Sequence, residues 1–245
     1  MRETDRAADR AMGAPVFPLP PPSAAPARER LLLEFLTARE SFRLPAKLPV
    51  LATKKAKIAR TVLLVPGLGA TDASLLPLRT YLRRVGHDAR SIGFGRITDD
   101  VEGQYLRLRN RVNDVVREIG GPVVLVGWSI GGVLSRETAR DVPAQVRRVI
   151  TFGTPAVGGP AYSQVARRYD ARSLRTIVEA VDERSRTLIT VPITAIWSRR
   201  DGIVAPAACI DRLNPDVEHV EVGSTHLGMG IDPDVWKVVA ARVEQ

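Results

Sequence analysis

One serine stands between two glycines where an apolar stretch ends. The segment LVGWSIGG, residues 125–132, places Ser129 between Gly127 and Gly131. In the pattern G-x-S-x-G, the serine occupies a tight turn from a strand into a helix, and the flanking glycines remove side chains that would collide with that turn. Such a turn exposes the hydroxyl group. Ser129 is therefore a candidate nucleophile.

A serine hydroxyl needs a general base, because it is scarcely ionised at neutral pH. Of the three histidines in the chain, His226 lies in EVGSTHLGMG, a glycine-bounded loop after the last predicted strand. His87 falls in the turn VGHDAR, and His219 falls inside the alternating segment VEHVEV. We expect His226 to be the base. The alternative is an ordinary solvated loop histidine.

A catalytic histidine in turn needs a carboxylate to fix its tautomer and to stabilise the imidazolium. Asp201 follows the apolar segment PITAIWS, in SRRDGIV, and precedes His226 in the chain. Loop aspartates also form turns and helix caps, which is the alternative for Asp201. The other candidates are weaker because they stand in helix or turn contexts: Asp211, Asp216 and Asp232.

Attack on a carbonyl also requires donors for the developing oxyanion. The backbone N–H of Ile130, directly after the nucleophile, is one candidate. The glycine-containing segment TVLLVPGLGATDAS supplies the second, and we expect the N–H of Leu68 to fill this role. The alternative is a plain flexible turn between a strand and a helix.

These residues need a scaffold that brings strand ends together. From residue 60 onward, short β-branched segments alternate with amphipathic stretches such as SLLPLRTYLRRVG and VEGQYLRLRNRVNDVVREIG. This alternation predicts an α/β fold with a parallel sheet covered by helices on both faces. Ligands of such sheets bind at the carboxyl ends of the strands. Six strand segments are clear: TVLLVPG, DARSIGF, PVVLVGW, VRRVITFG, PITAIWS and VEHVEV.

The segments VLLVPGLGA, VGWSIGG, VITFGTPAVGG, SRRDGIV and STHLGMG together resemble the successive landmarks of the α/β-hydrolase superfamily, and within it bacterial lipase-like or esterase-like serine hydrolases. The resemblance spans residues 60–245. It implies an eight-stranded, mostly parallel sheet, with Ser129 as nucleophile, Asp201 as acid and His226 as base. It also implies a lid or cap within residues 156–191, which are short and charged here. The chain departs from the pattern in having PGLG where many members have His-Gly.

The N-terminal region differs in composition from the rest. Residues 1–27 are rich in proline and predict a disordered tail, and the prolines interrupt any signal-peptide-like apolar stretch. Residues 28–59 predict a helix, RERLLLEFLTARE, followed by a basic linker. The helix either packs on the body or provides a surface for peripheral contact with anionic lipid. The hydrolase domain is then residues 60–245.

Charge and cysteine content exclude several classes of protein. The net charge is +9, but residues 1–60 hold 12 Lys/Arg against 6 Asp/Glu, which leaves 24 against 21 in the nearly neutral remainder. No stacking or zinc-finger motif accompanies the basic residues, so we expect no nucleic-acid binding. The single cysteine, Cys209, excludes an internal disulfide and fits a reducing compartment, so we expect a cytoplasmic or membrane-peripheral protein.

The residues together predict a serine hydrolase that cleaves carboxylic esters through an acyl-enzyme, acts on a small ester or lipid-like substrate, and needs neither metal nor organic cofactor. Two alternatives stay open. The same three residues support an acyltransferase or a thioesterase. The third interpretation is a non-catalytic binding protein on a hydrolase fold.

Overall fold

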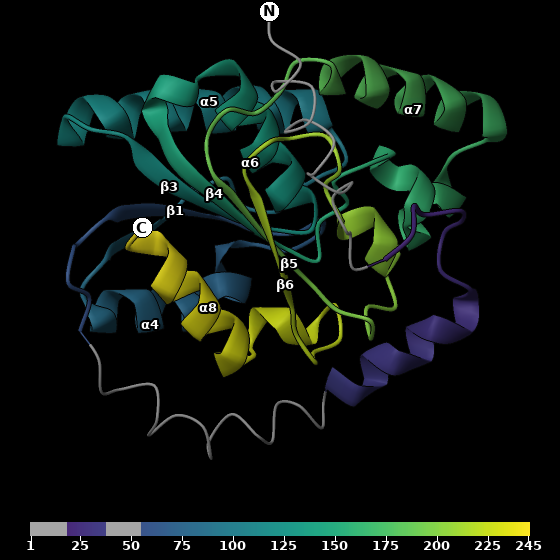
Figure 1. The fold of residues 1–245 in the computed structure, drawn as a ribbon, viewed down its shortest axis with the longest axis horizontal. Coiled ribbons are helices and arrows are strands. Elements are labelled where there is room, and N and C mark those ends of the chain that lie inside the picture. The colour runs from purple at the N-terminus through teal and green to yellow at the C-terminus, as the bar shows by residue number, and fades with distance from the viewer. Residues whose placement is uncertain (1–18, 38–54) are drawn as a thin grey trace, which may run out of the picture.

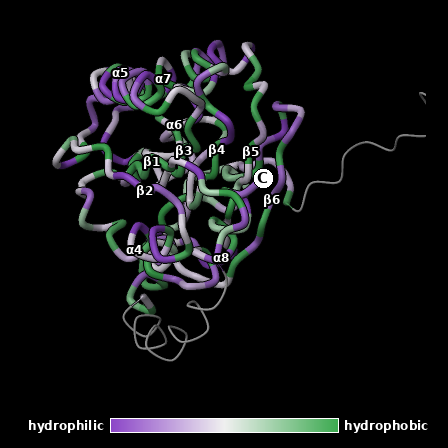
Figure 2. The backbone as a smooth tube through the Cα atoms, turned by 90° about the vertical axis from the view of Figure 1, so that its left-hand side faces the viewer, coloured by the Kyte–Doolittle hydropathy of each residue, from purple (hydrophilic) through white to green (hydrophobic). Residues whose placement is uncertain are grey.

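A computed structural model describes residues 19–37 and 55–245. Within these ranges the chain forms one parallel sheet of six strands in the order β2-β1-β3-β4-β5-β6. Figure 2 shows the strands side by side in the middle of the molecule. Their bounds are β1 (Thr61–Val65), β2 (Asp88–Ser91), β3 (Val123–Trp128), β4 (Val146–Phe152), β5 (Ile193–Trp197) and β6 (Val217–Glu221).

Helices cover both faces of the sheet, as Figure 1 shows. On one face, α4 (Leu76–Val85) and α8 (Pro233–Val243) pack against one set of strand side chains. On the other face, α5 (Val101–Ile119) and α6 (Ile130–Asp141) pack against the alternate set. All six residues of β3 are buried, as expected of a central strand covered on both sides. The two cores hold the carboxyl ends of the strands in place.

Helix ends follow local sequence signals. The Asp100 side chain accepts a hydrogen bond from the N–H of Gly103 at 3.0 Å and so caps the start of α5. The same helix ends at Gly120, whose φ of 70° is left-handed. Short 3₁₀ helices complete the connections: η2 (Asp72–Leu75), η3 (Pro143–Gln145), η6 (Pro206–Cys209) and η7 (Gly228–Gly230).

The predicted α/β fold is confirmed, and each of the six predicted strand segments contains one of the observed strands. The sheet of the described residues has six strands rather than the eight that the resemblance implied. None of the helices in the described ranges has the length and apolar character needed to cross a bilayer.

Residues 19–27 differ from the disordered tail predicted for residues 1–27. Residues 1–18 and 38–54 lie outside the described residues, but residues 19–27 contact the body of the protein. The carbonyl of Pro26 accepts hydrogen bonds from the side chains of Gln164 and Arg167, at 3.1 and 3.2 Å. Prolines favour extended backbone, which leaves carbonyls free to accept from the body. The 3₁₀ helix η1 (Arg28–Phe35) follows directly.

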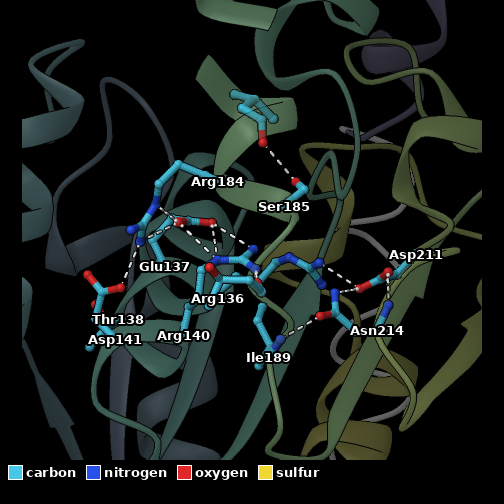
Figure 3. Close-up of polar contacts among 12 residues, drawn as sticks. Arg136, Glu137, Thr138, Arg140, Asp141, Arg184, Ser185, Ile189, Asp211 and Asn214 are labelled. Atoms are coloured by element: carbon cyan, nitrogen blue, oxygen red, sulfur yellow. Dashed lines mark hydrogen bonds and ion pairs between the residues drawn. The ribbon is translucent and has the colours of Figure 1, made fainter. Parts of the chain in front are cut away.

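The predicted lid region folds into η4 (Gly159–Tyr162), η5 (Gln164–Arg168) and α7 (Ala171–Ser185). No residue of α7 is buried. Ion pairs join this helix to α6, since Arg184 lies 2.9 Å from both Glu137 and Asp141, as Figure 3 shows. The helix therefore rests on the surface of α6 through charged groups.

Candidate active site

Ser129 occupies the turn between β3 and α6. Its φ of 55° and ψ of −123° make it the one non-glycine residue with positive φ in the described part of the chain. Such a conformation costs about 1–3 kcal/mol and persists only where the surrounding structure enforces it. The Ser129 N–H donates to the carbonyl of Phe152 at 2.9 Å, which ties the turn to β4.

Three glycines make this turn sterically feasible. A Cβ at Gly127 would lie 2.4 Å from the Cα of Gly132, and one at Gly131 would lie 2.2 Å from the carbonyl oxygen of Val65. At Gly132 a Cβ would meet Oγ1 of Thr154 at 2.1 Å. Each distance is shorter than any real contact of a Cβ atom. The glycines therefore let helix α6 approach both neighbouring strands.

Asp201 and His226 form a buried pair at the carboxyl ends of the strands. Asp201 follows β5, and its Oδ2 lies 2.7 Å from Nδ1 of His226 in the loop after β6. The other carboxylate oxygen, Oδ1, accepts hydrogen bonds from the N–H groups of Ile203 and Val204, at 2.9 and 2.7 Å. These bonds fix the carboxylate. The imidazole is consequently held through one of its nitrogens, with the other left for a substrate or the serine.

The environment of His226 favours its charged form. Burial lowers the pKa of the imidazole, but the negative charge and hydrogen bond of Asp201 and the charge of Glu34 outweigh this effect and raise the pKa above its ordinary value of 6.5. A proton taken up by this ring is therefore stabilised by two carboxylates.

Ser129 and His226 line one open cavity of about 470 Å³. This volume lies within the range of small-molecule sites. Trp128 belongs to the same wall, with its ring centroid 6.0 Å from that of His226. Apolar side chains contribute much of the lining, together with three charged ones: Leu31, Leu68, Ile97, Val165, Ile203 and Leu227, with Arg96, Asp99 and Arg168.

The predicted oxyanion donors lie beside this cavity. Ile130 is the first residue of α6, where the helix leaves N–H groups without an intrahelical partner. Leu68 lines the cavity, and its neighbour Gly67 approaches the serine, since a Cβ there would lie 3.4 Å from Cβ of Ser129. The loop after β1 thus reaches the turn at Ser129.

The other histidines lie elsewhere. His87 is buried directly before β2, at the amino end of the strand, and burial lowers its pKa. His219 lies within β6, and its Nε2 accepts a hydrogen bond from the N–H of Asp211 at 3.0 Å. Burial lowers the pKa of His219 as well. Neither residue belongs to the cavity wall.

The rival aspartates have structural contacts of their own. Asp211 forms a buried ion pair with Arg136, with Oδ2 and Nη2 2.6 Å apart. Asp232 caps α8 by accepting from the N–H of Asp234. Asp216 is exposed. In the described ranges, no cluster of three or more His, Cys, Asp or Glu side chains is arranged to hold a metal ion.

Two contacts of the site were not anticipated from the sequence. Thr154, in the Gly-Thr-Pro segment after β4, donates from its hydroxyl to the carbonyl of Ser129 at 2.9 Å. Glu34, in η1, accepts from the backbone N–H of His226 at 3.1 Å. The Gly-Thr-Pro segment lies within VITFGTPAVGG, one of the segments that carry the family resemblance. No sequence signal connected Glu34 with a loop 192 residues away.

The chain belongs to the α/β-hydrolase family, whose family model matches residues 62–241. Comparison with curated proteins gives no match. Among solved structures, the fold is similar to the lipase BlEst2 of Bacillus licheniformis, with a TM-score of 0.59 and 14% identity over 79% of this chain and 95% of that one.

Two further structures resemble the fold. The monoacylglycerol lipase of Paleococcus ferrophilus has a TM-score of 0.57 and 14% identity, over 75% of this chain and 93% of that one. The thioesterase domain from the curacin biosynthetic pathway has a TM-score of 0.51 and 13% identity, over 78% and 93%. At these identities the likeness establishes the fold.

Proposed function

We propose that this protein is a serine hydrolase that cleaves carboxylic esters through an acyl-enzyme. One observation carries the proposal: Ser129, in a strained turn, shares a cavity with His226, whose Nδ1 lies 2.7 Å from the buried carboxylate of Asp201. Nucleophile, base and orienting acid are the three roles that acyl transfer requires.

In the proposed reaction, Oγ of Ser129 attacks the ester carbonyl carbon while Nε2 of His226 takes the hydroxyl proton. The carbonyl oxygen becomes an oxyanion, which the N–H groups of Ile130 and Leu68 stabilise. The C–O bond to the alcohol then breaks, and His226 returns the proton to the departing alkoxide. Water, deprotonated by His226, hydrolyses the acyl-enzyme in the same way and restores the serine.

The cavity suggests the kind of substrate. Its volume of about 470 Å³ and apolar lining suit a small ester or one lipid-like chain. An acyl-enzyme can also be formed from a thioester or resolved by an alcohol, so a thioesterase or an acyltransferase is the second candidate. The similarity in fold to the curacin thioesterase domain supports this second candidate. Product analysis with and without added alcohol separates these reactions.

Cytoplasmic location and contact with anionic lipid complete the proposal. The buried, unpaired Cys209 fits a reducing compartment. The basic Lys55 and Lys57 precede β1 and lie toward the amino ends of the strands, away from the cavity. A lipid surface that delivers substrate to the cavity would instead contact η1. In this helix Leu32 and Phe35 are exposed, and Leu31 lines the cavity.

Intact-mass spectrometry after treatment with a fluorophosphonate tests the nucleophile. Wild-type protein is expected to gain one adduct, and the Ser129→Ala variant none, with both proteins folded by circular dichroism. Turnover of p-nitrophenyl esters of increasing chain length then defines the acyl preference. Absence of an adduct on folded wild type would overturn the proposal in favour of a non-catalytic binding protein on this fold.

A further inference from the structure

The carboxylate of Glu34 contacts two loops that are far apart in the sequence. Its Oε1 accepts hydrogen bonds from the N–H of Gly202 at 2.9 Å and from the N–H of His226 at 3.1 Å. Its Oε2 accepts from the N–H of Leu227 at 2.8 Å. Three backbone donors thus converge on one partly buried side chain, and bonds of this charge-assisted kind are stronger than neutral ones.

These two loops carry the acid and the base of the candidate site. Gly202 directly follows Asp201, so one oxygen of Glu34 bonds the loop of the acid. The same oxygen bonds the backbone of His226 itself. Glu34 therefore joins the two loops through their backbone N–H groups. Asp201 and His226 contact one another through their side chains.

Helix η1 packs closely against these two loops. A Cβ at Gly202 would lie 2.2 Å from the carbonyl oxygen of Arg30, so only glycine permits this approach. The Arg30 guanidinium donates to the carbonyl of Arg199. Beyond η1, the hydroxyl of Thr37 lies 2.6 Å from that of Thr225, the residue before His226. Several independent contacts therefore place Glu34 where it lies.

We infer that Glu34 is a positioning residue: its carboxylate joins the Asp201 loop to the His226 loop and so holds the imidazole in place for proton transfer. This inference deepens the proposed function and rests on it. The inference also makes η1 part of the structure that supports the candidate active site. Glu34 is not itself among the residues that line the cavity, and it acts through the backbone of His226 and Leu227, which do line it.

The charges around His226 give the inference a measurable signature. The negative charges of Asp201, in the loop after β5, and of Glu34, in η1, both raise the pKa of His226. Burial of the imidazole lowers it. The cavity wall near it also holds Arg96, Asp99 and Arg168. Removing the charge of Glu34 lowers the His226 pKa. Because the base works in its neutral form, the acidic limb of the pH profile of kcat/KM then moves to lower pH.

The test compares Glu34→Gln with wild type over pH 5 to 9, using a p-nitrophenyl ester. Glutamine retains the shape and one acceptor oxygen but loses the charge. We expect kcat at the alkaline plateau to fall about tenfold, with KM within about twofold of wild type and with the acidic limb at lower pH. The matched control is Glu29→Gln on the same helix, since Glu29 is exposed. Its profile should coincide with that of wild type.

A second readout does not depend on turnover. The chain has three histidines, so the proton NMR signals of His226 can be assigned with His87 and His219 variants and titrated directly. The His226 midpoint should fall in Glu34→Gln and stay unchanged in Glu29→Gln. A fall in this midpoint with no ester turnover in wild type would support the contact and overturn the proposed function instead.

Gly202→Ala provides an independent test, because its Cβ would displace η1 while keeping Glu34 in the chain. It should reproduce both the loss of kcat and the fall in the His226 midpoint. This variant also serves if Glu34→Gln fails to fold. An unchanged His226 midpoint in the folded variants, with lower thermal stability as the one effect, would show a purely structural contact and overturn the inference.

Discussion

Nδ1 of His226 lies 2.7 Å from Oδ2 of Asp201, and both side chains are buried. The bond occupies one ring nitrogen of an imidazole that lines the same cavity as Ser129. Charge and geometry thus act together on one imidazole, and its titration becomes the most direct report on the site.

The raised pKa of His226 predicts the pH dependence of activity. In the proposed mechanism the neutral ring is the base, so kcat/KM for an ester should rise with pH through a midpoint above 6.5. The stability contribution has the opposite sign: the protonated ring stabilises the fold fully below pH 6.5, and this contribution is lost as pH rises through the folded-state pKa. Initial rates and urea unfolding over the same pH range measure both trends.

Asp201→Asn should lower the His226 pKa and remove the charge that stabilises the imidazolium. We expect kcat/KM to fall by about three orders of magnitude while the protein stays folded. Asp216→Asn is the matched control, since Asp216 is exposed and, like Asp201, lies in the connection between β5 and β6. Equal activity of the two variants would show that Asp201 is not the acid.

The close approach of α6 to β1 predicts a steric limit at Gly131. Alanine there would place Cβ 2.2 Å from the carbonyl of Val65, a rigid backbone atom. Gly131→Ala should therefore lose about 1–3 kcal/mol of unfolding free energy or fail to fold. Gly121→Ala, with open space around the added methyl, should stay within about 0.5 kcal/mol of wild type in urea unfolding.

The hydroxyl of Thr154 donates a hydrogen bond to the carbonyl of Ser129, so the segment after β4 supports the turn at Ser129. Thr154→Val keeps the shape and removes the bond. The expected cost is about 1 kcal/mol, seen as an approximately fivefold lower kcat/KM. Thr154→Ser keeps the hydroxyl and should retain the larger share of the activity. A valine variant as active as the serine variant would contradict this role.

The buried pair of Asp211 and Arg136 predicts a stability effect unconnected with catalysis (Figure 3). Burial raises the pKa of Asp211, but Arg136 and hydrogen bonds outweigh it and leave the pKa below 3.8. This stabilisation is therefore present above pH 3.8 and lost as pH falls through the folded-state pKa. Asp211→Asn should cost about 3–5 kcal/mol at pH 7.

The control for Asp211 is Asp114→Asn, which breaks an exposed ion pair with Arg117 within α5. Surface pairs of this kind contribute about 0–0.5 kcal/mol. Chemical denaturation of both variants at pH 7 makes the comparison. A loss at Asp211 no larger than at Asp114 would show that the buried pair contributes no net stability.

The α/β fold could be predicted from local sequence patterns, because strands and amphipathic helices each have a characteristic spacing of apolar residues. Ser129 was predicted since its turn needs glycines at fixed spacing, and the positions of Asp201 and His226 follow from strand ends that meet in any parallel sheet. Their catalytic roles stay predictions until the variants are measured.

Glu34 could not be predicted in this way. A glutamate on an amphipathic segment ordinarily faces water, and only the docking of η1 on loops 168 and 192 residues away gives it three backbone donors. The same holds for residues 19–27, whose prolines predicted an unattached tail. Contacts between remote segments depend on the whole packing, and no local spacing encodes them.

The family match begins at residue 62, whereas part of the cavity wall comes from Leu31. A gene trimmed to the matched boundaries would encode Ser129, Asp201 and His226 but would lack Leu31 and Glu34, so the cavity would lose part of its wall and His226 would lose one of the two carboxylates near it. The boundary of the family match and the boundary of the candidate site therefore differ in this chain. We therefore expect the proposed ester turnover to be lower in the trimmed protein than in the full chain.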